Sequence, residues 1–108
     1  MTSTSTASVP TARPGRYAKQ LVAHMSRKVP AHWDDAAASG RVSFPTGELE
    51  LGCDPDALLL TLTADADLER WEGVVGSHLV RFGTRDELVV SWRRDDGTAG
   101  TVQRASED

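Results

Sequence analysis

Two histidines, His24 and His78, are the side chains of this chain best suited to chemistry near neutral pH. An imidazole titrates in that range and binds zinc, iron or copper, so the pair could serve as metal ligands or as a general acid and base. Two ligands without a nearby carboxylate or thiolate make a weak metal site, however. The alternative of two partly buried histidines, each holding one hydrogen bond to a neighbouring group, therefore stays open.

Basic and hydroxyl side chains accompany the histidines at helical spacing. Tyr17, His24 and Lys28 are seven and four residues apart, which brings them onto one edge of a helix. Arg81 follows His78 by about one turn in a second helical stretch. If the two edges face each other, they form a positive groove that attracts a carboxylate or phosphate ligand. The competing interpretation is that these basic side chains are ordinary solvent-exposed charges. A cation near the C-terminus of a helix is stabilised by the helix dipole without any ligand.

Other residues add little chemistry. Cys53 is the only cysteine, so an internal disulfide is excluded, and it would be a third metal ligand only if its strand lay under both helices. The sequence contains no phosphate-binding loop, dinucleotide fingerprint, nucleophile elbow or zinc-protease motif. A histidine-based enzyme would thus lack an identifiable nucleophile or cofactor. The sequence favours a binding protein over an enzyme and names no cofactor.

Two amphipathic helices must position these side chains. The first covers Arg16 to Lys28 and ends before Pro30. The second covers Ala66 to Phe82 and carries the most regular apolar stripe of the chain. Asp65 is its expected N-cap, and Gly83 is expected to end it in a left-handed conformation.

Six further segments alternate apolar and polar residues as strands do. They are Ser5 to Val9, Ala31 to Asp35, Gly40 to Phe44, Glu48 to Cys53, Ala57 to Ala64 and Glu87 to Arg93. The order β-α-β-β-β-β-α-β predicts an α+β fold, a single antiparallel sheet with two helices packed on one face, similar to the TATA-binding protein. We expect residues 1–93 to form this domain and residues 94–108 a polar tail. A hairpin strand around Gly100 to Gln103 is the alternative.

Composition limits the partners. The net charge of −4 over 108 residues disfavours a nucleic-acid surface. The chain does not open on a signal peptide, and no apolar run approaches the roughly 20 residues of a membrane span. We therefore expect a cytoplasmic protein without nucleic-acid or membrane partners.

Two stretches, RYAKQLVAHMSRK (Arg16 to Lys28) and EGVVGSHLVRFGTRDELVVSW (Glu72 to Trp92), resemble the small bacterial proteins called domain of unknown function 2218. The similarity runs from about Ser5 to Trp92. The family pattern maps onto Tyr17, Lys19, Gln20, Leu21, His24, Lys28, His78, Leu79, Arg81, Phe82 and Glu87 to Trp92. The resemblance implies no established activity. Some members are associated with siderophore-interacting proteins, which implies a context of iron acquisition.

The residues and the resemblance together predict a small binding module, accessory to iron, siderophore or metal handling. Its ligand-binding residues would be Tyr17, His24, Lys28, His78 and Arg81, with His24 and His78 as the ligands of any metal. The expected partner is a small anion or a metal. The alternative is a protein–protein interaction or homodimerisation module that uses an open sheet edge or polar sheet face.

Overall fold

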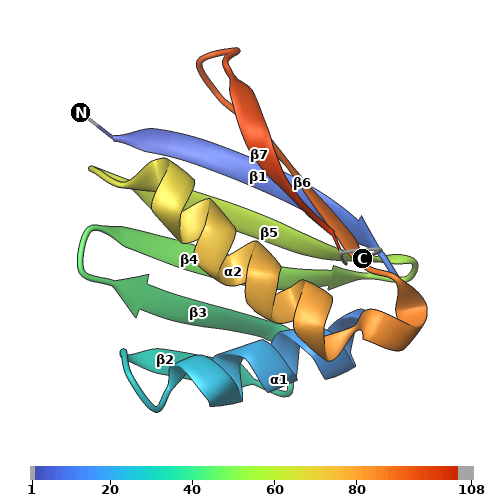
Figure 1. The fold of residues 1–108 in the computed structure, drawn as a ribbon. Coiled ribbons are helices and arrows are strands. Elements are labelled where there is room, and N and C mark those ends of the chain that lie inside the picture. The colour runs from blue at the N-terminus through green and yellow to red at the C-terminus, as the bar shows by residue number, and fades with distance from the viewer. Residues whose placement is uncertain (1, 105–108) are drawn as a thin grey trace.

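The computed structural model describes residues 2–104, which form one antiparallel sheet with two α-helices on one of its faces (Figure 1). The elements in chain order are β1 (Ser3–Pro10), α1 (Pro14–Met25), β2 (Ala31–Asp34), β3 (Ser39–Phe44), β4 (Gly47–Asp54), β5 (Ala57–Ala64), α2 (Leu68–Phe82), the 3₁₀ helix η1 (Thr84–Asp86), β6 (Val89–Arg94) and β7 (Ala99–Arg104). The predicted α+β fold is confirmed. Within the described range, neither helix has the length and apolarity needed to cross a membrane.

The first strand of the chain lies inside the sheet. The strand order is β2-β3-β4-β5-β1-β6-β7, so β1 lies between β5 and β6. Its pairing with β5 extends from Ser3 opposite Ala64 to Pro10 opposite Ala57. Its pairing with β6 is limited to Ser5 with Arg94 and Thr6 with Arg93. The sheet is therefore held together across β1, and its edges are β2 and β7.

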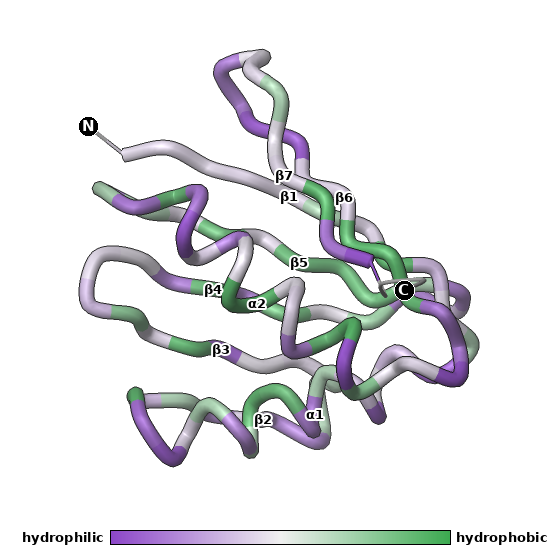
Figure 2. Tube along the Cα trace, viewed as in Figure 1, coloured by the Kyte–Doolittle hydropathy of each residue, from purple (hydrophilic) through white to green (hydrophobic). Residues whose placement is uncertain are grey.

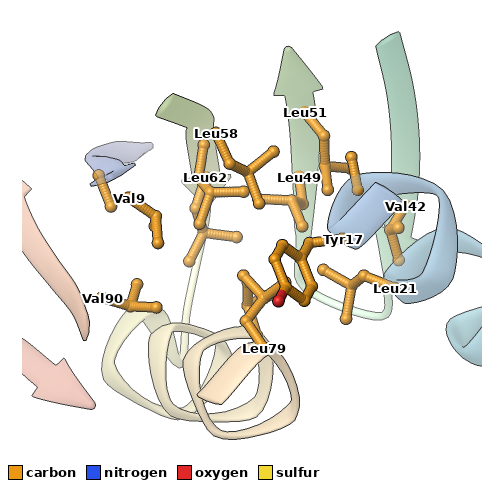
Figure 3. Packing of buried hydrophobic residues seen from close by; sticks show 14 of the residues in the cluster. Val9, Tyr17, Leu21, Val42, Leu49, Leu51, Leu58, Leu62, Leu79 and Val90 are labelled. Carbon is orange, nitrogen blue, oxygen red and sulfur yellow. The ribbon is translucent and has the colours of Figure 1, made fainter. Parts of the chain in front are cut away.

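The core lies between the sheet and the helices. Alternation on β5 buries Leu58, Leu60 and Leu62, while Leu59 points to the helix-free face with 40% of its surface exposed. Leu21 of α1 and Leu79 of α2 pack against this layer (Figure 3). Each fully buried side chain of this size contributes roughly 1.5–3 kcal/mol. The helices are thus anchored by their apolar faces, and Figure 2 shows α2 alternating between apolar and polar residues.

The ends of α2 differ from the expectation. The helix begins at Leu68, and its N-cap is Asp67, which has a left-handed φ of 63° and no side-chain capping bond. The predicted cap, Asp65, instead accepts a 2.9 Å hydrogen bond from the Thr2 hydroxyl. Gly83 ends the helix with φ of −102°, so the predicted left-handed glycine was also wrong.

The predicted polar tail was wrong for Ala99 to Arg104, which form strand β7. This strand pairs antiparallel with β6, with Val89 opposite Arg104 and Ser91 opposite Val102. It also packs against α2. The last part of the expected tail, residues 105–108, lies outside the described residues.

Candidate functional site

The two histidines meet between the helices. The ring centroids of His24 on α1 and His78 on α2 are 4.7 Å apart, with the ring planes inclined by 46°. Phe82, about one turn after His78, packs against both rings at centroid distances of 5.6 and 6.2 Å. Both imidazoles are half-buried. The question that the sequence left open, whether the two rings approach each other, is settled in favour of contact.

The hydrogen bonding of His78 defines its tautomer. Its Nδ1 lies 2.6 Å from the carbonyl oxygen of Val74. A carbonyl only accepts, so Nδ1 carries the proton and donates it. In the neutral ring the lone pair is then on Nε2, the nitrogen that can accept a proton or ligate a metal.

The charged neighbours that act most strongly on His24 are positive. Burial is the largest cause that lowers the pKa of His24, and positive neighbours lower it further. These neighbours are, in decreasing order of effect, His78, Arg27, Lys28 and Arg81. Among residues 2–104 no ion pair engages any of these three lysine or arginine side chains. The histidine pair therefore lies among cations that form no ion pair with any carboxylate of residues 2–104.

A hollow of about 250 Å³ opens beside His24, lined also by Gln20, Ala23, Arg27 and Phe82. Sequence reasoning missed Gln20 and Arg27 as lining residues. Their signal was present, because they lie four residues before and three residues after His24 on the same helical face. The amide of Gln20 and the guanidinium of Arg27 can both donate hydrogen bonds to an anion in this hollow.

Tyr17 is buried, and its hydroxyl has a hydrogen-bond partner inside the protein. Its side chain is buried, 6% exposed, with the ring near Leu21 and Leu79 (Figure 3). Its hydroxyl donates a hydrogen bond to the carboxylate of Asp86, and that bond, followed by burial, raises the pKa of Tyr17. Tyr17 ties α1 to the turn after α2 and directs its hydroxyl to Asp86.

The structure assembles no complete metal-ligand set. The described residues contain no group of three or more histidine, cysteine or acidic side chains able to hold a metal ion. Cys53, the third ligand considered, is half-buried at the end of β4, and burial raises the pKa of its thiol. Any metal at His24 and His78 would need most of its ligands from outside these residues.

A second polar cluster, which sequence reasoning missed, is built around Glu72 of α2. The side chain is fully buried, and each carboxylate oxygen accepts several hydrogen bonds. Oε2 accepts from the Ser5 hydroxyl at 2.6 Å and from Arg94 Nε at 3.2 Å. Oε1 accepts from Arg94 Nη2 at 3.0 Å and from the hydroxyl and backbone N–H of Thr101 at 2.9 and 3.2 Å. The cluster joins α2 to β1, β6 and β7.

The Glu72 cluster keeps its charge and leaves no room for a ligand. Burial raises the pKa of Glu72, but hydrogen bonds from Arg94, Ser5 and Thr101 outweigh burial and hold the pKa below its usual value. No buried side-chain polar atom of the described residues lacks a partner. The signal was helical spacing, because Glu72 lies four residues after Leu68 and therefore falls within the apolar stripe.

The chain is a small α+β protein with a single antiparallel sheet, and its two histidines meet between the helices. The chain belongs to the family described as "Uncharacterized protein conserved in bacteria (DUF2218)", whose sequence profile matches residues 6–93. It is similar to PA4090 from Pseudomonas aeruginosa, whose NMR structure covers 93% of this chain and matches over 98% of its own length, with 25% identity and a TM-score of 0.65. No functionally curated protein matches the sequence. The resemblance noted in the sequence is confirmed.

Proposed function

We propose that this protein is a small cytoplasmic binding module that takes a compact anionic ligand in the groove between α1 and α2. The observation that carries the proposal is the contact of His24 with His78 at 4.7 Å among exposed cations that have no ion-pair partner in residues 2–104. In a chain with net charge −4, a local excess of positive charge attracts anions selectively.

The size of the hollow favours a small ligand. Its volume of about 250 Å³ is below the range of roughly 300–1,000 Å³ that is typical of pockets for drug-sized molecules. Arg27 lines it with a planar guanidinium that can bind a carboxylate through two parallel hydrogen bonds. A compact carboxylate such as citrate fits both the charge and the volume.

If the protein handles iron, we propose that it binds the metal as a negatively charged chelate. A bare cation is repelled by Arg27, Lys28 and Arg81, whereas ferric iron surrounded by carboxylates or catecholates carries net negative charge. The Nε2 of His78 would then be an outer contact or a replacement ligand of the chelated metal. Direct ligation of a free metal by His24 and His78 is the weaker form of the same proposal.

The test is a titration of tag-free protein with citrate, ferric citrate and zinc, each followed by calorimetry and absorption spectroscopy. We expect citrate or its ferric chelate to bind, and the His24→Ala/His78→Ala variant to lose that binding while keeping its thermal transition. Arg93→Gln is the matched control, because it removes an exposed arginine from the helix-free face. Unchanged binding in the double histidine variant, or no binding of any probe to the native chain, would refute the proposal.

A second candidate, an interaction or homodimerisation module, is favoured by the helix-free face of the sheet. Leu59 and Val89 are 40% and 37% exposed there, beside a groove of about 630 Å³ that crosses β5, β1 and β6. Apolar side chains gathered at a groove are typical of association surfaces. Light scattering at rising concentration, for the native chain and for Leu59→Ser/Val89→Ser, tests this candidate. A strict monomer at the highest concentration removes its homodimer form.

A further inference from the structure

We propose that a second hollow, between α2 and β7, binds a carboxylate that carries an apolar chain. Helix α2 lies between α1 on one side and β7 on the other, so this hollow and the histidine groove are separated by the helix (Figure 1). The described residues that line the second hollow line no part of the hollow beside His24. The inference is therefore independent of the proposed function.

The size and the apolar side chains of the α2–β7 hollow suit a small amphipathic molecule. Its volume is about 600 Å³, within the range of roughly 300–1,000 Å³ typical of small-molecule sites. Val80 of α2 and Val102 of β7 both line it. Val80 is buried, whereas Val102 is 47% exposed, the highest exposed fraction among the large apolar side chains of residues 2–104. An apolar chain lying between the two valines would remove this surface from water.

The charge of the α2–β7 hollow specifies the other end of the ligand. Arg81 of α2 and Arg104 of β7 line it, together with the hydroxyl side chain of Ser77, and no aspartate or glutamate of residues 2–104 does. Neither guanidinium forms an ion pair within that range. A guanidinium binds a carboxylate through two parallel hydrogen bonds, so two of them from different elements define a carboxylate site.

The helix dipole explains only one of these arginines. Arg81 lies in the last turn of α2, where a cation is favourable without any ligand. Arg104 belongs to a strand and has no such reason to face the same hollow. Carbonyl groups at this end of the helix are already hydrogen-bonded, because Thr84 Oγ1 donates to the carbonyl of Arg81 at 3.0 Å and the N–H of Gly83 donates to that of Leu79 at 2.9 Å. Their partial negative charge is thus partly neutralised within the protein.

The wall formed by β7 is held in place before any ligand arrives. The amide of Gln103 accepts a hydrogen bond from Trp92 Nε1 at 2.7 Å and donates one to Thr101 Oγ1 at 2.8 Å. Thr101 in turn donates to the carboxylate of Glu72 on α2. These bonds fix β7 against α2, so the α2–β7 hollow is preformed and little ordering opposes binding.

The test compares octanoate with two ligands that each lack one half of it. Octanamide keeps the chain without the charge, and acetate keeps the charge without the chain. Each is titrated into the tag-free full chain, labelled with ¹⁵N and followed by nuclear magnetic resonance. We expect octanoate to bind at least about tenfold more tightly than either, and to shift the amide signals of Ser77, Val80, Val102 and Arg104.

Variants separate the two halves of the site. Arg81→Gln and Arg104→Gln should each weaken octanoate binding roughly tenfold, since each removes charge-assisted hydrogen bonds. Val102→Thr keeps the shape of the side chain and should weaken the binding of octanoate without affecting acetate. Arg93→Gln, on the helix-free face, is the matched control and should bind as the native chain does. All variants should keep the thermal transition of the native chain, because the substituted side chains are at the surface or at its edge.

The double variant His24→Ala/His78→Ala distinguishes this site from the histidine groove. It should bind octanoate with native affinity. Octanoate that shifts Gln20 and Ala23 alone, or that no longer binds to the double histidine variant, would overturn the α2–β7 site and support the proposed function instead. Equal affinities for octanoate and octanamide, or no saturable binding of octanoate, would overturn the α2–β7 site without affecting the proposed function.

Discussion

Two polar clusters lie six residues apart on the same helix, and they are built in opposite ways. Around Glu72, a buried negative charge meets a guanidinium, two hydroxyls and a backbone N–H. Around His78, an imidazole meets the imidazole of His24, which itself lies in the field of Arg27, Lys28 and Arg81. The first cluster is closed and electrically balanced, whereas the second is open and carries charges of one sign.

This difference separates a structural cluster from a candidate binding site. A cluster in which each donor meets an acceptor has all its partners inside the molecule, so it contributes to stability. A cluster of like charges weakens the fold slightly, and an external anion removes that penalty.

Replacing Glu72 with alanine should have the largest effect. The change leaves Arg94 half-buried without its carboxylate and removes acceptors from Ser5 and Thr101. Breaking one partner of a buried ion pair typically costs about 3–5 kcal/mol in the free energy of unfolding. Urea denaturation measures the loss, and Glu50→Ala, an exposed glutamate on β4, is the control. A loss no larger than that of the control would show that the Glu72 cluster is not structural.

The pH dependence of this contribution has a definite sign. Hydrogen bonds hold the pKa of folded Glu72 below the value that it takes in the unfolded chain. The carboxylate therefore contributes its full stabilisation above the unfolded pKa and loses it as the pH falls through the folded value. Glu72→Gln should show a flatter loss of stability in acid than the native chain does, as measured by denaturation at a series of acidic pH values. An equally steep acid limb would contradict this account.

Gly76→Ala should destabilise the fold by about 1–3 kcal/mol, because the added methyl collides with the neighbouring polar network. A Cβ at position 76 would lie 2.0 Å from Gln103 Oε1, the atom that accepts a 2.7 Å hydrogen bond from Trp92 Nε1. Thermal denaturation of both single variants and of Gly76→Ala/Gln103→Ala measures the coupling. The double variant should lose less than the sum of the two single variants, and strict additivity would exclude the predicted clash.

Tyr17→Phe should cost about 1 kcal/mol, the usual contribution of one hydrogen bond, and should not change anion binding. The variant removes the hydroxyl that donates to Asp86 and keeps the buried ring. Denaturation and citrate titration of the same sample separate the two effects. A weaker affinity at unchanged stability would show that the Tyr17 hydroxyl contributes to the binding site.

His24→Gln should have the smallest effect on the stability of the ligand-free protein, and its pH dependence should have the same sign as that of Glu72, because the pKa of both groups is lowered in the folded state. Burial and positive neighbours hold the pKa of His24 below its unfolded value, so protonation opposes the fold as the pH falls below that value. The variant should gain about 0.2–1 kcal/mol relative to the native chain near pH 5 and nothing near pH 8. Denaturation at the two pH values checks this, and a gain that is equal at both would refute the like-charge description.

The helices and six of the strands could be predicted because they depend on local periodicity. Apolar residues recur every two residues along a strand and every three to four along a helix, and this spacing shows which face of each element is buried. The sequence placed His24 beside one apolar stripe and His78 within another, but it left open whether the two rings meet, because that depends on how the helices pack on the sheet. The hydrogen-bond partner of Tyr17 could not be predicted, because a ring at a helix edge can point inward as readily as outward and Asp86 is remote in sequence.

Strand β7 was predicted only as the alternative to a polar tail, around Gly100 to Gln103, because the rules of periodicity favour it weakly. The sequence from Ala99 to Arg104 lacks an apolar alternation, and its position depends on hydrogen bonds from Thr101 to Glu72 and from Trp92 to Gln103. Such long-range polar contacts leave no periodic trace in the sequence. The N-cap of α2 was mispredicted for a related reason. The Asp65 carboxylate accepts a hydrogen bond from the hydroxyl of Thr2, which is remote in sequence.

The central position of β1 has a consequence for how the chain folds during synthesis. Strand β1 leaves the ribosome before its partners, because it pairs with β5 and β6, which both come later in the chain. Until β5 has emerged, β1 has no partner, so closure of the sheet is late and the contact order is high. Removal of the first ten residues would take out the strand that joins β2-β3-β4-β5 to β6-β7, and it would divide the sheet instead of shortening one edge.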